Sequence, residues 1–303
     1  MRVAVVVKRS AYRLHVEEGS DARVKRLLAK GDPTVSRMRG AHDDHVATTG
    51  EVLEALGHLG AKVTLREGSR SKLGGRFDLV VTVGGDGTLL AASHQIGPDS
   101  AILGVNSSPG NSVGFFCAAK KGSVLPTLRS ALEGSLARAT LTRMRVEMNG
   151  HVLHNRVLNE ALICHACPAA TSRYILTTRD PRGRTREEEQ KSSGLWIGPP
   201  AGSTAAQASA GGKVLPLLAR TLQYVVREPY TPAGVPLQLR VGRVDAGGEI
   251  VVRSKMREAE IFLDGHHVLF SATLGDVIRL RTSDEPLTVL GLSARRSRRP
   301  KSG

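Results

Sequence analysis

Short apolar runs alternate with helix-like spacing through the first 137 residues. The run from Phe77 to Val83 is typical of a buried parallel strand, and Val46, Leu53 and Leu56 follow helical spacing. Further strands are predicted at 2–7, 61–67 and 101–106, and helices near 21–30, 42–59 and 122–136. Strands that alternate with helices form a parallel sheet covered on both faces. We therefore expect residues 1–137 to form a Rossmann-like α/β domain.

After Ala137 the pattern changes to strands that leave little room for crossover helices. These strands are predicted at 140–148, 152–157, 172–178, 238–244, 249–256, 260–263, 267–270 and 277–280. The turn residues Asp245 to Gly248 join one pair of strands, and Asp264-Gly265 joins another as a hairpin. Residues 138–287 should therefore form an antiparallel β-sandwich domain. The last segment, 288–303, is a basic tail that either stays in solvent or packs back on the N-terminal domain.

Composition narrows the classes of partner. Lysine and arginine exceed aspartate and glutamate by 43 − 28 = 15, so the chain should attract anions such as nucleotides and polyphosphates. Aromatic residues make up only 3%, which leaves few platforms for base stacking, and we expect no specific nucleic-acid partner. No apolar run approaches the ~20 residues of a membrane span. Three cysteines cannot form a disulfide framework, so a cytoplasmic location is expected.

The stretch from Phe77 to Ser93 carries the clearest chemistry. Its strand breaks at Gly84-Gly85-Asp86-Gly87-Thr88 and resumes as a run of helix formers. Such a turn presents backbone N–H groups and a helix dipole to phosphate, and its glycines let a ligand approach the backbone closely. Asp86 adds a carboxylate, which suggests a base acting on a hydroxyl beside a phosphate, with a metal ion present. The alternative is an ordinary turn in which Asp86 only lies near the helix N-terminus.

Two further stretches carry polar or small residues in suggestive places. Residues 192–212, SSGLWIGPPAGSTAAQASAGG, have small side chains and hydroxyls that would let an extended ligand lie close to the backbone. A small-residue helix packed tightly on a sheet explains the same pattern. Asn159 and Glu160 end a predicted strand, where an amide and a carboxylate can contact an adenine edge and a ribose diol. In isolation, two polar residues at a strand exit carry little information.

Several common motifs are absent. Lys8-Arg9-Ser10-Ala11 follows the first strand, without the GxGxxG of a dinucleotide-binding Rossmann unit, and no GxxxxGK[ST] phosphate loop occurs. No HExxH or HxxEH zinc motif occurs either. Cys164 and Cys167 form a CxxC, but a structural zinc site would need another ligand pair, so we interpret this motif as incidental.

Four of these motifs together resemble the ATP-dependent NAD kinase family. They are GGDGT at 84–88, LNE at 158–160, PAGSTAA..SAGG at 200–212 and DG at 264–265, in the family's order. GGDGT alone is shared with diacylglycerol and sphingosine kinases of the same superfamily. The match runs from about Phe77 to Phe270, and the sequence around SSGLW looks most like the branch that contains plant NADH kinases.

The resemblance implies a reaction and a set of roles. In that family the dinucleotide lies in the cleft between an α/β domain and a β-sandwich, and its adenosine ribose 2′-hydroxyl attacks the γ-phosphate of ATP. Asp86 matches the proposed general base, and the GGDGT backbone would hold phosphates. The implied binding residues are Gly84, Gly85, Gly87, Thr88, Asn159, Glu160, Lys191, Ser193, Thr204, Ala205, Ala206, Gln207, Ala208, Ser209 and His266. Mg²⁺ would accompany ATP, no residue is assigned as a metal ligand, and a homodimer or homotetramer is expected.

The chain departs from the common bacterial pattern at three positions. Ser193 stands where most members have aspartate, Ala206 where they have tyrosine, and His266 where glutamine is frequent. The first two fall on the nicotinamide side of the pocket, where a carboxylate would partner a cationic ring. We therefore hypothesise altered discrimination between NAD⁺ and NADH, in favour of NADH. Lys191 stands where a basic residue is frequent, and either faces a phosphate or faces solvent.

Two alternatives to a dinucleotide kinase stay open at this point. A diverged lipid kinase would share GGDGT and a sandwich, but should lack the GSTAA..SAGG run. A noncatalytic nucleotide-binding regulator would explain Ser193 and Ala206, although an intact Asp86 speaks against it.

Overall fold

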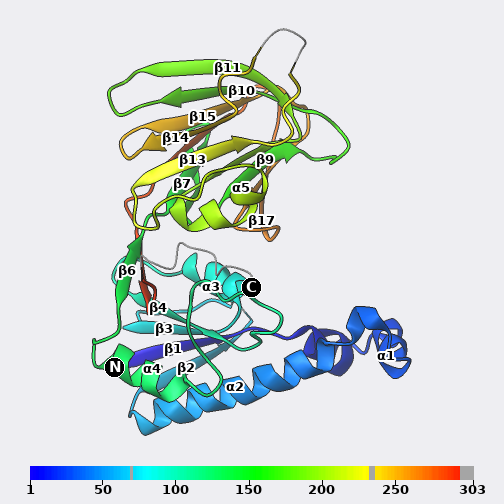
Figure 1. The fold of residues 1–303 in the computed structure, drawn as a ribbon, viewed down its shortest axis with the longest axis vertical. Coiled ribbons are helices and arrows are strands. Elements are labelled where there is room, and N and C mark those ends of the chain that lie inside the picture. The colour runs from blue at the N-terminus through cyan, green and yellow to red at the C-terminus, as the bar shows by residue number, and fades with distance from the viewer. Residues whose placement is uncertain (69–70, 232–235, 294–303) are drawn as a thin grey trace, which may run out of the picture. The chain divides into compact units, whose positions relative to one another are not determined.

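The computed structural model describes residues 1–68, 71–231 and 236–293, which form two compact units (Figure 1). Unit 1 contains Met1–Ala139 and takes the chain back at Thr288, and unit 2 contains Thr140–Leu287. The basic residues 295–301 lie outside the described residues. Among the described residues, no helix combines the length and the apolar character needed to cross a bilayer.

Unit 1 is built on a sheet to which the described residues contribute seven strands. Its order is β2-β1-β3-β4-β19-β6, and β5 also pairs with β4. The strands are β1 (Arg2–Val7), β2 (Lys62–Glu67), β3 (Leu79–Gly84), β4 (Ala101–Asn106), β5 (Cys117–Lys120), β6 (Arg138–Leu141) and β19 (Leu287–Leu290). The pairs β1–β2, β1–β3, β3–β4, β4–β5 and β4–β19 are parallel. Strands β3 and β4 are buried along their whole length, as their unbroken apolar runs predict.

Helices cover both faces of this sheet (Figure 1). They are η1 (Arg13–Glu18), α1 (Ala22–Ala29), η2 (Pro33–Val35), α2 (Met38–His58), α3 (Asp86–Ser93) and α4 (Val124–Leu132). Leu56 of α2 and Leu128 of α4 pack with Val5, Val81 and Leu103 in one core cluster, and α3 lies over the opposite face. The α/β class predicted for this part is therefore confirmed.

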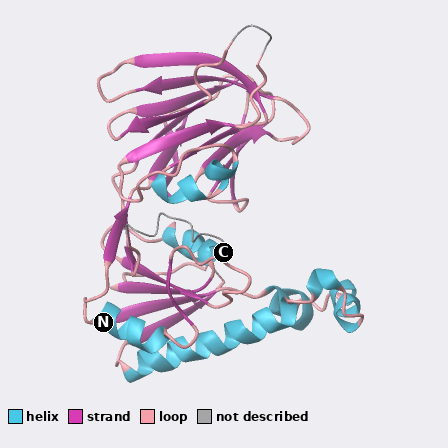
Figure 2. Cartoon of the chain, in the orientation of Figure 1, coloured by secondary structure: helices cyan, strands magenta, loops and turns pink. Residues whose placement is uncertain are grey.

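Unit 2 is an antiparallel β-sandwich, as predicted (Figure 2). Within the described residues, one six-stranded sheet has the order β11-β10-β15-β18-β7-β8, and the other has the order β14-β13-β12-β9-β16-β17. Their strands are β7 (Met144–Met148), β8 (His151–Val157), β9 (Ala161–His165), β10 (Ser172–Arg179), β11 (Thr185–Ser192), β12 (Leu195–Gly198), β13 (Thr221–Val226), β14 (Val241–Asp245), β15 (Glu249–Ser254), β16 (Ala259–Leu263), β17 (Val268–Ala272) and β18 (Val277–Thr282). Tyr174 and Ile250 from the first sheet and Ile197 and Ile261 from the second share one buried core.

Two sequence expectations in this region were wrong. The single strand predicted at 140–148 is two strands, β6 and β7, which belong to different sheets. The chain breaks there because Arg143 is fully buried and its guanidinium donates to the carbonyls of Glu285 and Pro286. The strands on either side of Asp245–Gly248 do not form a hairpin. Strand β14 pairs with β13, whereas β15 pairs with β10 and β18, so this turn carries the chain from one sheet to the other.

The hairpin predicted at Asp264-Gly265 is confirmed. Strand β16 pairs with β17, with Leu263 opposite Val268. Asp264 and Gly265 have φ values of 48° and 104°, in the left-handed region that such a turn requires.

Candidate functional site

The glycine turn of unit 1 joins β3 to α3. β3 ends at Gly84, Gly85 caps α3, and Asp86 is its first residue. A Cβ on Gly84 would lie 2.2 Å from Thr88 Oγ1, and a Cβ on Gly85 would lie 2.4 Å from Ser112 Oγ. Space, rather than an unusual φ angle, therefore requires glycine at both positions. The turn brings all five residues of GGDGT together, with Gly87 exposed and Asp86 half-buried.

Asp86 also organises the loop that follows β4. Its Oδ2 accepts a hydrogen bond from the backbone N–H of Phe115, and its Oδ1 accepts one from that of Phe116, both at 2.9 Å. Asn106 holds the same loop, because its Nδ2 donates to Ser112 O at 3.0 Å. A carboxylate has about four acceptor positions, so Asp86 can accept these two amides and still accept a substrate hydroxyl.

A buried histidine of helix α2, His45, lies beside the turn and contacts the residue that follows the end of β4. His45 Nδ1 is 2.9 Å from Ser107 Oγ, its Nε2 is 2.9 Å from Lys8 O, and the Ser107 N–H donates to Gly84 O at 3.1 Å. Burial, then the charge of Lys8, lowers the pKa of His45 to about 4, so its ring is neutral at pH 7. Burial also lowers the pKa of Lys8. Nothing in the sequence pattern had indicated this histidine.

Asn159 and Glu160 lie in unit 2, in the connection between β8 and β9. Each is only 9% exposed, and Asn159 Oδ1 and Glu160 Oε2 are buried without a hydrogen-bond partner among the described residues. Burial, and then the nearby carboxylate of Asp264, raises the pKa of Glu160 to about 8. Buried polar atoms are normally hydrogen-bonded, so two orphaned acceptors side by side in sequence mark a place for ligand donors.

The small-residue run packs directly against Asn159. It forms β12, the 3₁₀ helix η3 (Pro200–Thr204) and the four-residue helix α5 (Ala206–Ser209). A Cβ on Gly202 would lie 1.8 Å from Asn159 O, and one on Gly198 would lie 2.1 Å from the same atom. Gln207 is fully buried, and its side-chain amide contacts Asn159 O at 3.4 Å and Gln223 Nε2 at 3.0 Å. Both tight packing and a ligand surface are thus built from the same run.

A cavity of about 540 Å³ opens next to this run. Its lining consists of Trp196, Ala206, Ser209, Ala210, Arg227 and Glu228. The Arg227 guanidinium lies 5.7 Å from the centre of the Trp196 ring. Ser193 does not line the cavity itself but is bonded to a lining residue, because its N–H donates to Arg227 O at 3.0 Å. Sequence analysis placed Ser193 and Ala206 on one side of a pocket but assigned no role to Trp196, although it lies in the SSGLW stretch, and missed Arg227, which lies outside any motif.

The remaining predicted residues are less closely gathered. Thr204, Ala205 and Ala208 are half-buried along the small-residue run. Lys191 lies on β11 with an exposed side chain, and among the described residues its ammonium group has no hydrogen-bond or ion-pair partner. His266 is exposed in the β16–β17 turn, where its ring centre is 3.8 Å from that of His267.

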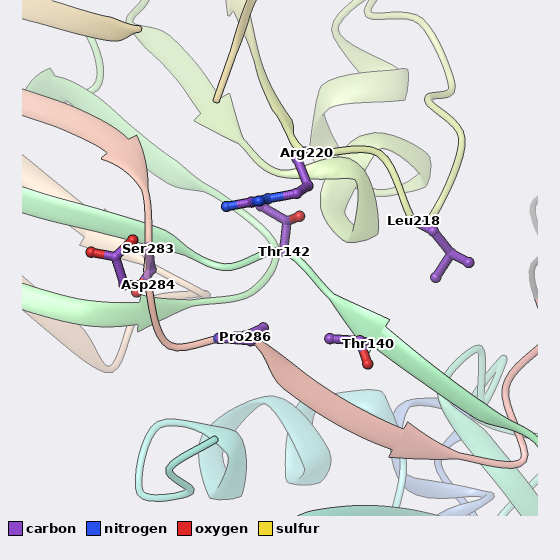
Figure 3. A pocket seen from close by; sticks show the side chains of 7 residues that line it. All are labelled: Thr140, Thr142, Leu218, Arg220, Ser283, Asp284 and Pro286. Atoms are coloured by element: carbon purple, nitrogen blue, oxygen red, sulfur yellow. The ribbon is translucent and has the colours of Figure 1, made fainter. Parts of the chain in front are cut away.

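The CxxC motif and a second cavity stand apart from these clusters. Burial raises the pKa of Cys164, Cys167 is exposed, and both are free thiols. In the described parts of the chain, no three His, Cys, Asp or Glu side chains form a metal-binding group. Figure 3 shows a cavity of about 460 Å³ in unit 2 that contains none of the predicted site residues. Its lining residues are Thr140, Thr142, Leu218, Arg220, Ser283, Asp284 and Pro286.

A glycine turn with one carboxylate on an α/β unit, and a β-sandwich with orphaned buried acceptors, fit a nucleotide-binding protein of the kinase class. Comparison with known proteins gives the family. The family model described as the ATP-NAD kinase N-terminal domain matches residues 1–135. A probable NADH kinase of Oryza sativa subsp. japonica is 38% identical over 226 residues, which cover 69% of each chain. The chain belongs to the NAD kinase family, and the resemblance drawn from its sequence is confirmed.

Other relatives agree. The NADH kinase of Arabidopsis thaliana is 37% identical over 71% of this chain and 73% of that protein. The NAD kinase of Rhodopirellula baltica is 30% identical over 75% of this chain and 71% of that protein. The crystal structure of an NAD kinase from Archaeoglobus fulgidus in complex with ATP shares the fold, with a TM-score of 0.65 over 97% of this chain and 95% of that chain at 21% identity.

Proposed function

We propose that this protein transfers the γ-phosphoryl group of ATP to the adenosine ribose 2′-hydroxyl of NAD⁺ or NADH, forming NADP(H). Family membership supports the kinase activity and both substrates. The structural observation that carries the assignment of roles is the half-buried carboxylate of Asp86 at the glycine turn. No relative named above is a lipid kinase or a regulator.

Each cluster of residues has a part in this reaction. The backbone of Gly84 to Thr88 would hold phosphates, and Asp86 would act as the general base toward the 2′-hydroxyl. A carboxylate is a weak base toward an alcohol, so the position of Asp86 matters more than its proton affinity. The orphaned acceptors of Asn159 and Glu160 would receive the adenine amino group and a ribose hydroxyl. Gln207 uses its amide on Asn159 and Gln223, so we assign it to shaping the pocket.

A divalent metal ion fits this site only as a companion of ATP. The described residues offer no cluster of three metal ligands, which excludes a protein-made cage within that part of the chain. Mg²⁺ characteristically binds through substrate phosphates, waters and one or two carboxylates. Asp86 is the carboxylate at the turn and would be the protein group nearest to it. When bound, Mg²⁺ would neutralise charge on the transferring phosphoryl group.

The assay that tests this function couples NADPH formation to a specific dehydrogenase. We expect ATP with NAD⁺ or NADH to give NADP⁺ or NADPH, and a diacylglycerol substrate to remain unphosphorylated. Repeating the assay with polyphosphate in place of ATP determines which of the two is the phosphoryl donor. If neither dinucleotide is phosphorylated while the folded protein binds one of them, the kinase assignment is wrong and the noncatalytic alternative replaces it.

We further propose a preference for NADH. The cavity that includes Ala206 is lined by the Arg227 guanidinium and the Glu228 carboxylate, whose charges offset each other, and the neighbouring Ser193 supplies no further carboxylate. A cationic nicotinamide ring gains nothing from such a lining, whereas a neutral reduced ring meets no repulsion. We expect Ser193→Asp to shift the ratio of kcat/KM for NAD⁺ to that for NADH upward by roughly 5- to 30-fold, as one added charge interaction of about 1–2 kcal/mol implies.

Ser193→Asn is the matched control for that variant, because it has nearly the same size without the charge. An unchanged ratio in Ser193→Asp, or an equal shift in Ser193→Asn, would contradict a role for charge at this position. The family resemblance also supports a homodimer or homotetramer, which light scattering after size exclusion would test. The three cysteines, too few for a disulfide framework, support a cytoplasmic location, which cell fractionation would test.

A further inference from the structure

Asp264 holds the connection that carries Asn159 and Glu160. Its Oδ2 accepts a hydrogen bond from the N–H of Leu158 at 2.8 Å, and its Oδ1 accepts those of Asn159 and Glu160 at 2.7 and 3.1 Å. Its own N–H donates to Glu160 O at 2.9 Å. Three successive amides therefore converge on one carboxylate, in the geometry by which backbone loops bind anions.

The position of Asp264 is itself constrained. It follows Leu263, which pairs with Ala161 across β16 and β9, so the turn sits level with the β8–β9 connection. Its φ of 48° is uncommon for a residue with a side chain, and the four hydrogen bonds hold it there. On the other side, Asn159 O meets the backbone of Gly202 so closely that no Cβ fits. The connection is thus fixed from two directions, with both orphaned acceptors left free for a ligand.

We propose that Asp264 is a positioning residue for dinucleotide binding: it uses its carboxylate to fix the backbone at Leu158–Glu160, so that Asn159 and Glu160 present their side-chain oxygens to the nucleoside before it arrives. This proposal rests on the proposed function of Asn159 and Glu160. The residue does not touch the substrate in this scheme and acts only through its neighbours. The DG motif had been interpreted only as a hairpin turn.

The charges around Asp264 give the proposal an electrostatic signature. Burial lowers the pKa of the Arg143 guanidinium, which lies beside β7. The nearby carboxylates of Glu285 and Asp264 raise that pKa by a smaller amount. Arg156 of β8 pairs with Glu285 at 2.6 Å. The pKa of Glu160 is raised first by burial and then by the negative charge of Asp264, so both disfavour its ionisation. Replacing Asp264 by a neutral residue should therefore make Glu160 easier to ionise, a change that a general loss of stability would not produce.

The test is Asp264→Asn, with direct calorimetric binding of NAD⁺ and NADH and full kinetics from pH 6 to 9. Asparagine places an NH₂ group against at least one of the three amides, so the connection loosens. We expect Kd and KM for the dinucleotide to rise at least ~10-fold, KM for ATP to stay within about twofold, and the midpoint of the pH dependence of dinucleotide binding to move to lower pH.

Asp276→Asn is the matched control in the same unit. Asp276 lies beyond the other end of β17, where its Oδ2 accepts the Thr273 N–H at 2.7 Å and its Oδ1 accepts Asn149 Nδ2 at 2.7 Å. This variant should lower the melting temperature without changing dinucleotide Kd or the pH midpoint. A folded Asp264→Asn protein with wild-type Kd would overturn the proposal, as would equal effects from the two variants.

Hydrogen exchange of the wild-type protein tests the proposal even if Asp264→Asn does not fold. The amides of Leu158, Asn159 and Glu160 should be protected without ligand, and exchange as fast as that of an open loop would overturn the proposal. If the wild type binds dinucleotide without phosphorylating it, the kinase reaction fails and the positioning role stands. If the wild type binds no dinucleotide, both fail.

Discussion

Replacing Asp86 with asparagine is expected to lower kcat roughly 10²- to 10⁴-fold, the range usual for loss of a general base. The amide cannot take the 2′-hydroxyl proton, whereas the backbone of the glycine turn, which we propose holds the phosphates, stays in place. Dinucleotide binding, measured by calorimetry, should therefore change by no more than about threefold. Single-turnover kinetics with ATP and NADH would show whether the loss lies in the chemical step.

Asp78→Asn provides the control for that experiment. Asp78 precedes β3 at the end opposite to Asp86, and its Oδ2 accepts the Arg2 N–H at 2.7 Å. Both substitutions remove a carboxylate that binds backbone amides of unit 1, but only Asp86 lies at the turn. Near-normal turnover in Asp86→Asn, or an equal loss in Asp78→Asn, would remove the base role. If Asp86→Asn only loosened the loop at 107–116, KM would rise and kcat would not fall.

Glu160→Gln is expected to stabilise the protein at pH 8 while weakening dinucleotide binding. Because the folded-state pKa of Glu160 is about 8 against an ordinary value of 4.5, the native protein holds a proton that the unfolded chain has lost between these pH values. Wild-type stability therefore falls as the pH rises through this window. Glutamine does not ionise, so the variant should exceed the wild type by roughly 3–5 kcal/mol at pH 8 and by under ~1 kcal/mol at pH 5.

Chemical denaturation across pH 5 to 8.5 measures this difference. In the same variant, loss of a charge-assisted hydrogen bond should raise dinucleotide Kd roughly 10- to 100-fold at pH 8.5, where the wild-type carboxyl is mostly ionised, and less at lower pH. Glu258→Gln is the control, because it changes a carboxylate outside the cluster in the same unit. Gln190→Glu would not be suitable, because Oε1 of Gln190 is itself a buried acceptor without a hydrogen-bond partner among the described residues. If Glu160→Gln gains no stability at pH 8, or gains as much at pH 5, the raised pKa of Glu160 is contradicted.

The glycine turn was predictable from sequence because its signal is local. A β-branched run, three glycines around one aspartate and a run of helix formers occupy consecutive positions, and the structure places them as β3, the turn and α3. Asn159 and Glu160 were also found, although the residues alone carried little information and the family motif supplied their significance. The hairpin at Asp264-Gly265 was local too, and its strands pair as expected.

The features that sequence analysis missed depend on contacts between distant segments. The strands around Asp245–Gly248 resemble a hairpin by their turn chemistry, but their partners lie in opposite sheets, which only the packed sandwich decides. Strand β12 is four residues long and sits in a glycine-rich stretch, so no alternation could reveal it. Trp196 and Arg227 meet across β12 and β13, and Asp264 reaches amides more than a hundred positions away. Neither of these contacts produces a periodic pattern in the sequence.

The return of the chain at Thr288 has a consequence for biosynthesis. Strand β19 lies between β4 and β6 in the first sheet, yet it emerges from the ribosome after all strands of the sandwich. The amino-terminal half must therefore wait, with a gap in its sheet, while about 150 later residues are translated. The sheet that carries the glycine turn is therefore completed only after the sandwich has been translated, and a product that ended before Leu287 would leave β6 without its neighbour β19.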